Sequence, residues 1–121
     1  MKVFLIAALS IIFSVAAQFL LKAGMSSTEV KAVIGQAAAF RTISTVLTNK
    51  FVLIGFILYG LGAAMWLIVL SKWDVSKAYP LIGLGFGLAV LIGFSIGENI
   101  TGLRVLGVLL ICQGVWLVAS S

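Results

Sequence analysis

Four long apolar runs constrain this chain more than any other feature of its sequence. None of them holds a charged residue, and they cover Val3–Leu21, Phe51–Leu70, Ala78–Ile96 and Val105–Ala119. The first three are 19, 20 and 19 residues long, which is the length of helix that crosses the hydrocarbon core of a bilayer. The fourth holds 15 residues and reaches that length over 103–121, with Arg104 extending toward the interface. The sequence therefore predicts an all-α membrane protein with four transmembrane helices.

The spans leave little of the chain unused. Of 121 residues, 63% are hydrophobic and 9% are charged, so lipid is the expected solvent for most of the chain. We expect a single domain over 1–121, with helices at about 3–24, 51–71, 76–97 and 103–120.

A cleaved signal peptide is the alternative for the first run. That run continues past the small-residue site Ser14–Ala16, however, and is longer than a signal core.

The one long connection, residues 26–50, predicts an additional amphipathic segment between the first and second helices. Ser26 and Glu29 have the spacing of a capping box. Apolar residues then recur near the helical period, at Val30, Val33, Ile34, Ala37, Phe40 and Leu47. This pattern is typical of a helix that lies at the membrane interface, where it would serve as an anchor or as a lateral gate for a lipid.

Polar residues in the first helix form a single stripe. Ser10, Ser14, Gln18 and Lys22 follow one another at intervals of four and therefore share one face. Polar groups inside a bilayer face a partner helix or a wet cavity. Two interpretations stay open: hydrogen bonds between helices, with Lys22 reaching the surface, or a stripe that faces a substrate.

The third helix carries a second unusual face. Tyr79, Gly83 and Gly87 are four residues apart, so another backbone or a long ligand could lie close to that face. Pro80 removes a backbone hydrogen bond and should bend the helix near its start. Glycines at this spacing also occur where helices simply pack together.

The second helix places three larger residues on one face. Tyr59, Ala63 and Trp66 share that face, and Gly60 and Gly62 allow close approach of a neighbour. Trp66 lies well inside the run, away from the interface where tryptophan usually anchors a span. The face is either core packing or the wall of a binding cavity.

Charge is confined to the helix ends. Eight cations and three acids give a net charge of +5, which suits the membrane surface and an anionic lipid headgroup. Three cations lie on one side and five on the other, a small bias that permits either orientation and antiparallel dimers. No basic run with interleaved aromatics is present, so we expect no nucleic-acid partner.

Enzymatic chemistry has no visible basis in this sequence. Histidine is absent, Cys112 is the lone cysteine, and no nucleophile–base pair, metal-ligand cluster or phosphate loop is evident. We therefore expect no enzyme activity, no cofactor and no metal.

Across nearly its whole length the chain resembles small members of the drug/metabolite transporter superfamily. Gly107–Val115, with Gly107 and Gly114 seven apart, is similar to the last-helix dimerisation motif of the small multidrug resistance proteins. Ala78-Tyr79, preceded by Trp66, resembles their substrate tyrosine, and Gly97-Glu98 is similar to a turn found throughout the superfamily. The resemblance implies a dimer that meets along the fourth helix.

One departure separates this chain from the multidrug exporters. Those proteins couple to protons through a glutamate in the first helix, whose place is taken here by Ser14. A buried carboxylate can exchange a proton for a cation because desolvation raises its pKa. The three acids of this chain, Glu29, Asp74 and Glu98, all lie outside the apolar runs. Cation antiport of that kind therefore has no chemical basis here.

A closer resemblance is to the four-helix subunits that flip aminoarabinose linked to undecaprenyl phosphate across the bacterial inner membrane. Their first helix has a pattern similar to Ser14-Val-Ala-Ala-Gln18 followed by Lys22, and their spacing from tryptophan to Tyr-Pro is similar to that from Trp66 to Tyr79-Pro80. The connection at 26–50 is longer than expected in that family.

The resemblance implies a dimeric flippase, a homodimer or a heterodimer with a similar subunit, for a polyprenyl-phosphate-linked sugar. Cations near the interfaces would meet the phosphate: Lys22, Lys77 and Arg104. The head would contact Ser14, Gln18, Tyr79 and Trp66. The bend at Pro80 with Gly83 and Gly87 would leave a groove for the tail. The alternatives are a small-molecule exporter with another coupling scheme and a non-transporting subunit of a transporter complex.

Overall fold

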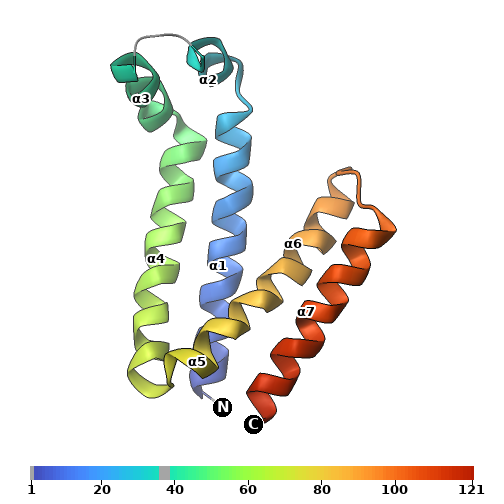
Figure 1. Cartoon of the computed structure of the whole chain (residues 1–121). Helices are drawn as coiled ribbons and strands as arrows, with labels where there is room; N and C mark the ends of the chain where they lie inside the picture. Colours follow the sequence, from blue (N-terminus) through green and yellow to red (C-terminus); the bar gives the residue numbers. More distant parts are fainter. Residues whose placement is uncertain (1, 36–38) are drawn as a thin grey trace.

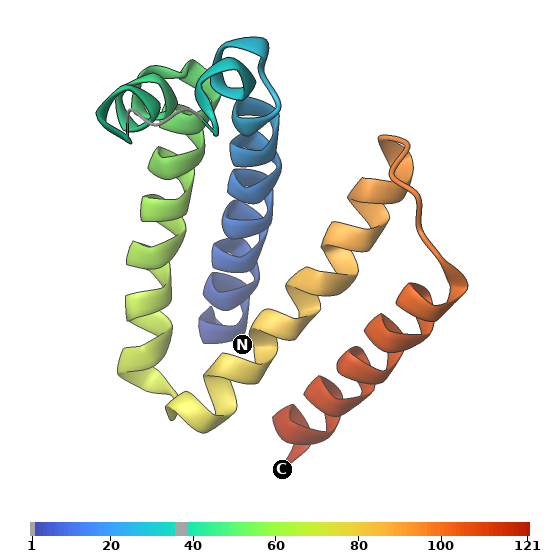
Figure 2. The same cartoon turned by 45° about the horizontal axis from the view of Figure 1, so that its top comes forward.

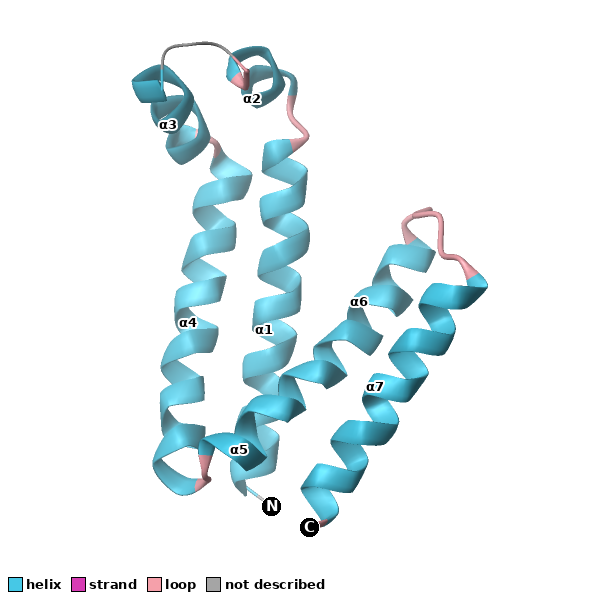
Figure 3. Cartoon of the chain, viewed as in Figure 1, coloured by secondary structure: helices cyan, strands magenta, loops and turns pink. Residues whose placement is uncertain are grey.

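A computed structural model describes residues 2–35 and 39–121 of the chain, and these residues form helices joined by short turns (Figures 1 and 3). Four segments are long and apolar enough to cross a membrane: α1 (Lys2–Met25), α4 (Lys50–Lys72), Val75–Ser95 and α7 (Gly102–Ser120). The predicted all-α membrane fold with four spans is confirmed. Ala37, part of the predicted amphipathic pattern, lies outside the described residues.

The first two spans form an antiparallel pair. Helices α1 and α4 lie side by side along their lengths (Figures 1 and 2), and glycines allow this close approach. A Cβ atom at Gly62 would lie 3.1 Å from the Ser10 carbonyl oxygen, and one at Gly55 would lie 2.9 Å from Leu21 Cδ2. Gly60 faces open space, so of the two glycines predicted to permit close approach only Gly62 does so.

The last two spans form the second pair. Helix α6 (Gly83–Ser95) packs against α7, and a Cβ atom at Gly83 would lie 2.8 Å from Ile111 Cγ2. One at Gly87 would lie 3.4 Å from Cys112 Sγ. The small residues of this helix face are therefore used for packing against α7.

A short bent segment joins the two pairs. The third span consists of α5 (Val75–Ala78), the 3₁₀ turn η1 (Tyr79–Ile82) and α6, and Pro80 lies in the first turn of η1. A 3₁₀ turn at this position accommodates the hydrogen bond that proline cannot donate. Ala78 and Leu81 are buried here in one apolar cluster with residues of three other spans: Ala7, Ile11, Val15, Val69 and Val115. From this end the two pairs diverge, as Figures 1 and 2 show from two directions.

The connection between α1 and α4 contains α2 (Thr28–Val33) and α3 (Ala39–Thr48), which lie across the ends of those spans (Figure 1). The Ser27 hydroxyl accepts a hydrogen bond from Val30 N at 3.3 Å and so caps α2, which places the cap one residue after the predicted Ser26. Asn49 caps α4 through its Oδ1, and its Nδ2 donates to Ser27 Oγ at 3.2 Å. The two caps thus join the ends of α1 and α4.

Replacing Gly62 by valine should loosen the pairing of α1 and α4. The added side chain meets the Ser10 carbonyl and Phe13, and overpacking of this kind costs about 1–3 kcal/mol of unfolding free energy. The measurement is the free energy of unfolding during SDS titration of mixed micelles. Gly60→Val, two residues away in open space, is the matched control; an equal loss in both variants would contradict the assignment.

Candidate functional site

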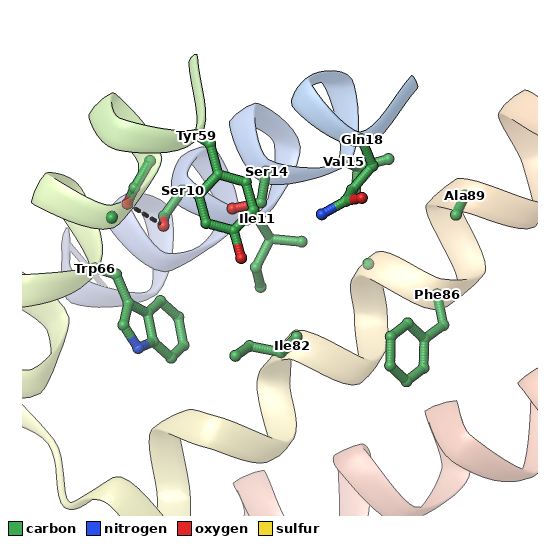
Figure 4. Close-up of a pocket in the computed structure, with 13 residues that line it drawn as sticks. Ser10, Ile11, Ser14, Val15, Gln18, Tyr59, Trp66, Ile82, Phe86 and Ala89 are labelled. Carbon is green, nitrogen blue, oxygen red and sulfur yellow. Dashed lines mark hydrogen bonds between the residues drawn. The ribbon is translucent and has the colours of Figure 1, made fainter. Parts of the chain in front are cut away.

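A groove of about 340 Å³ lies between the two pairs of spans (Figure 4). Its walls come from α1, α4, η1 and α6. The lining residues on α1 and α4 lie near the middle of each span. The lining residues are Ser10, Ile11, Ser14, Val15, Gln18, Tyr59, Gly62, Ala63, Trp66, Ile82, Gly85, Phe86 and Ala89.

The polar stripe of α1 divides into three parts. Ser10 is buried, and its hydroxyl donates a 2.6 Å hydrogen bond to the Gly62 carbonyl of α4. Ser14 and Gln18 point toward the groove (Figure 4). Lys22 lies one turn further on, exposed at the end of α1 and outside the lining. Hydrogen bonding between helices therefore accounts for Ser10, whereas a role of Ser14 and Gln18 toward a substrate stays a prediction.

Aromatic side chains supply much of the remaining wall. Tyr59 and Trp66 lie seven residues apart on α4 and both line the groove, and Phe86 lines it from α6 (Figure 4). Trp66 also packs against the apolar cluster near η1, so its face serves both as core and as cavity wall. The sequence predicts core packing or a cavity wall for the face that Tyr59 shares with Ala63 and Trp66, and Tyr59 is not among the residues expected from it to contact a substrate.

On α6, the glycine that borders the groove is Gly85, not Gly83 or Gly87. A Cβ atom at Gly85 would lie 3.1 Å from Ile11 Cγ2 and 3.2 Å from Val15 Cγ2, where α6 crosses α1. Because a helix turns about 100° per residue, Gly85 lies on the side of α6 opposite Gly83 and Gly87. Pro80 and Gly83 border the separate hollow between α6 and α7 instead, and a groove for a lipid tail along that face stays a prediction.

Tyr79 lies outside this groove as well. It is 65% exposed and borders a separate hollow between α6 and α7, with Gly83, Ile111 and Gly114. Only Ile82 and Phe86 border both hollows. Tyr79 is displaced because it shares its helix face with Gly83, and that face turns toward α7.

The three predicted phosphate-binding cations lie at the ends of the spans. Lys22 and Arg104 are at the end that carries α2 and α3, whereas Lys77 is at the opposite end (Figure 1). The Lys77 ammonium lies 4.9 Å from the centre of the Trp73 ring, and Arg104 Nη1 donates to the Asn99 carbonyl at 3.1 Å. None of the three lines the groove.

The groove is therefore uncharged and hydrogen-bonding, with aromatic faces. Its lining offers a serine hydroxyl, a glutamine amide, a tyrosine hydroxyl and an indole, and no lining residue is ionisable as an acid or base at neutral pH. Within 2–35 and 39–121, no cluster of His, Cys, Asp or Glu could hold a metal ion. Such a groove can accept a polar head and an alkyl chain.

The predicted dimer seam is open in the isolated chain. A Cβ atom at Gly107 or Gly114 would meet nothing within 4 Å, and most of α7 is exposed. A meeting of two subunits along this seam stays a prediction.

Four spans, three of which border an uncharged groove at mid-span, are an arrangement typical of a small membrane transporter. Neither the models of protein families nor the solved structures include a match to this chain. Curated proteins do match it. A probable 4-amino-4-deoxy-L-arabinose-phosphoundecaprenol flippase subunit ArnE of Pseudomonas savastanoi pv. phaseolicola is 35% identical over 86 residues, which cover 70% of this chain and 75% of that protein.

A second and a third relative carry corresponding names. The probable subunit ArnF of Proteus mirabilis is 28% identical over 109 residues, covering 87% of this chain and 82% of that protein. The probable ArnE of Pseudomonas paraeruginosa is 38% identical over 63 residues, which cover 51% of this chain and 55% of that protein. This chain belongs to the family of the 4-amino-4-deoxy-L-arabinose-phosphoundecaprenol flippase subunits, and it is a multi-pass protein of the bacterial inner membrane.

Replacing Ser10 by alanine should lower stability without altering the groove chemistry. Hydrogen bonds between membrane helices contribute about 0.6 kcal/mol on average, and this one joins the two most closely packed spans. The unfolding free energy in mixed micelles measures the loss. The control is Ser14→Ala, which removes a hydroxyl that faces the groove one turn away and should leave the unfolding free energy nearly unchanged. A larger loss of stability in the Ser14 variant than in the Ser10 variant would reverse the assignment of the two serines.

Proposed function

We propose that this chain is a subunit of a flippase that moves a polyprenyl-phosphate-linked sugar, or a related anionic lipid, across the inner membrane. One observation carries the proposal: the groove at mid-span is polar but uncharged, while cations stand at both ends of the spans. The named relatives are flippase subunits for such a lipid, which supports a transport role rather than an enzymatic one.

The head of the cargo would occupy the groove. Ser14, Gln18 and Tyr59 offer hydrogen bonds to sugar hydroxyls, and the Trp66 ring offers a flat apolar face for stacking. Buried polar groups need such partners, because an unsatisfied hydroxyl in hydrocarbon is costly. The tail would remain along the apolar part of the groove, beside Val15 and Ala89.

The phosphate would be held at the two ends of the path. Lys22 lies one turn beyond Gln18 on the same face of α1, and Lys77 lies at the opposite end of the protein. A lysine ammonium binds phosphate as a point charge, so each end has a cation for the same group. Arg104, at the start of α7, would act at the end where Lys22 lies.

We propose further that two subunits form the working unit, as a homodimer or as a heterodimer with a similar subunit. The open seam of Gly107 and Gly114 supports this, since small residues let helix backbones approach closely in a membrane. In such a dimer, rocking of the subunits about α7 would expose the groove to each side in turn.

Replacing Lys22 by alanine should weaken retention of polyprenyl phosphate and lower flipping. Hydrogen bonds to charged groups contribute about 1.5–3 kcal/mol, so we expect a loss of roughly tenfold or more while dimerisation is preserved. Native mass spectrometry measures retention, and flipping is followed in proteoliposomes. Lys31→Ala, an exposed cation of α2 at the same end, is the control. Wild-type flipping in the Lys22 variant would refute the anion site.

Replacing Gln18 by leucine should weaken binding of the sugar head. The loss of one neutral hydrogen bond contributes about 1 kcal/mol, or about fivefold in affinity for the lipid-linked sugar. Asn99→Leu, at an exposed position of the turn before α7 and outside the groove, is the control. Equal tolerance of both changes would favour a non-transporting subunit, in which the stripe is only a packing surface.

A small-molecule exporter is the second candidate. Its support is the aromatic wall of Tyr59, Trp66 and Phe86, because aromatic faces attract organic cations. It differs from the flippase in its ligand: retention of a quaternary-ammonium drug in place of polyprenyl phosphate, with drug-dependent proton movement in liposomes, would select the exporter.

A further inference from the structure

Helix α3 presents a row of large apolar side chains away from the protein. Phe40, Ile43 and Leu47 are 86%, 57% and 48% exposed, and no residue of α3 is buried. These three side chains fall within an arc of about 60°, because successive residues are about 100° apart around a helix. They form a narrow stripe, which we call the apolar flank.

A second exposed flank of α3 is polar. Arg41, Ser44 and Thr48 are exposed and fall within another arc of about 60°, next to the apolar flank. The side of α3 that remains is the one that meets the protein. There Thr42 is half-buried, and its hydroxyl donates a 3.1 Å hydrogen bond to the Val33 carbonyl of α2.

Contacts at both ends of the connection hold α3 in this orientation. Val30 and Val33 of α2 are buried, and the cap residue Asn49 binds Ser27. Helix α3 consequently lies at the end of α4, beside α2 at the end of α1 (Figures 1 and 2).

The apolar flank precedes, along the chain, a span that begins with exposed apolar residues. Phe51 and Ile54, in the first turns of α4, are 39% and 47% exposed on a membrane-spanning helix. Two cations lie near this end of the span: Arg41 belongs to the polar flank, and Lys50 is the first residue of α4. Apolar side chains on one flank of α3 and a cation on the other, next to the end of a membrane-spanning helix, match the boundary between acyl chains and phosphates.

We propose that α3 lies in the plane of the membrane, with Phe40, Ile43 and Leu47 among the upper segments of the acyl chains. Arg41, Ser44 and Thr48 face the headgroups. The occupant of the apolar flank is the lipid of one leaflet, and the helix fixes the depth at which α1 and α4 stand in the bilayer. This proposal does not depend on the transported cargo.

The test places a tryptophan on each flank. In the full chain, with Trp66, Trp73 and Trp116 replaced by phenylalanine, one variant carries Phe40→Trp and its matched control carries Thr48→Trp. Both are reconstituted in vesicles of phosphatidylethanolamine and phosphatidylglycerol that contain lipids brominated at defined acyl depths. The circular dichroism of each variant, compared with that of the unmodified chain, verifies that the helices are retained.

Bromines on the upper acyl chain should quench the fluorescence of the Phe40→Trp variant about twofold more than that of Thr48→Trp, and more than bromines near the chain ends do. Equal quenching of the two variants by bromine would overturn the proposal. So would protection of Phe40→Trp from both brominated lipid and aqueous acrylamide, because a second protein surface would then cover the flank. Strong quenching of Phe40→Trp by acrylamide alone would overturn it as well, by placing the flank in water.

Discussion

The close approach of α1 and α4 at Gly62 is the contact on which the rest of the structure depends. Between helices in lipid the hydrophobic effect contributes little, so association rests on packing and on hydrogen bonds. At Gly62 both act together. The missing side chain lets the α1 backbone approach, and the Ser10 hydroxyl donates to the Gly62 carbonyl. Because this contact is satisfied within the protein, the serine and glutamine further along α1 remain available to the groove.

The second pair of spans is attached quite differently. Helices α6 and α7 pack on each other through Gly83 and Gly87, but α6 meets α1 at a small crossing around Gly85. Two glycine faces of one helix thus perform separate tasks, one toward α7 and one toward α1. The groove exists because α6 meets α1 over a short length only, and because Pro80 lies where the chain turns from one pair to the other.

The sequence predicted the spans, the class of protein and part of the site, because apolar length and helical spacing are local properties. It predicted Ser14, Gln18 and Trp66 near mid-span, and these residues do line one groove. It could not assign Tyr79, Gly83 and Gly87, since a helical face is visible in sequence but its rotation relative to neighbours is not. That rotation depends on the contact of Gly83 with Ile111 and Val115, residues that lie about thirty positions away in the chain. Only the folded arrangement distinguishes Gly85 from its neighbours, or the partnered Ser10 from Ser14.

The single crossing of α6 over α1 has a mechanical consequence. With 13 residues, α6 is about 20 Å long, and it is joined at one end to the 3₁₀ turn. If a helix of that length rotated by about 10° at the turn, its far end would be displaced by roughly 3 Å, whereas residues near the turn would hardly move. The width of the groove would thus change most at the end far from the turn, and the buried cluster around Leu81 would stay nearly in place. A change of angle at Pro80 would therefore alter the space between the two pairs of spans more than it alters the packing around Leu81.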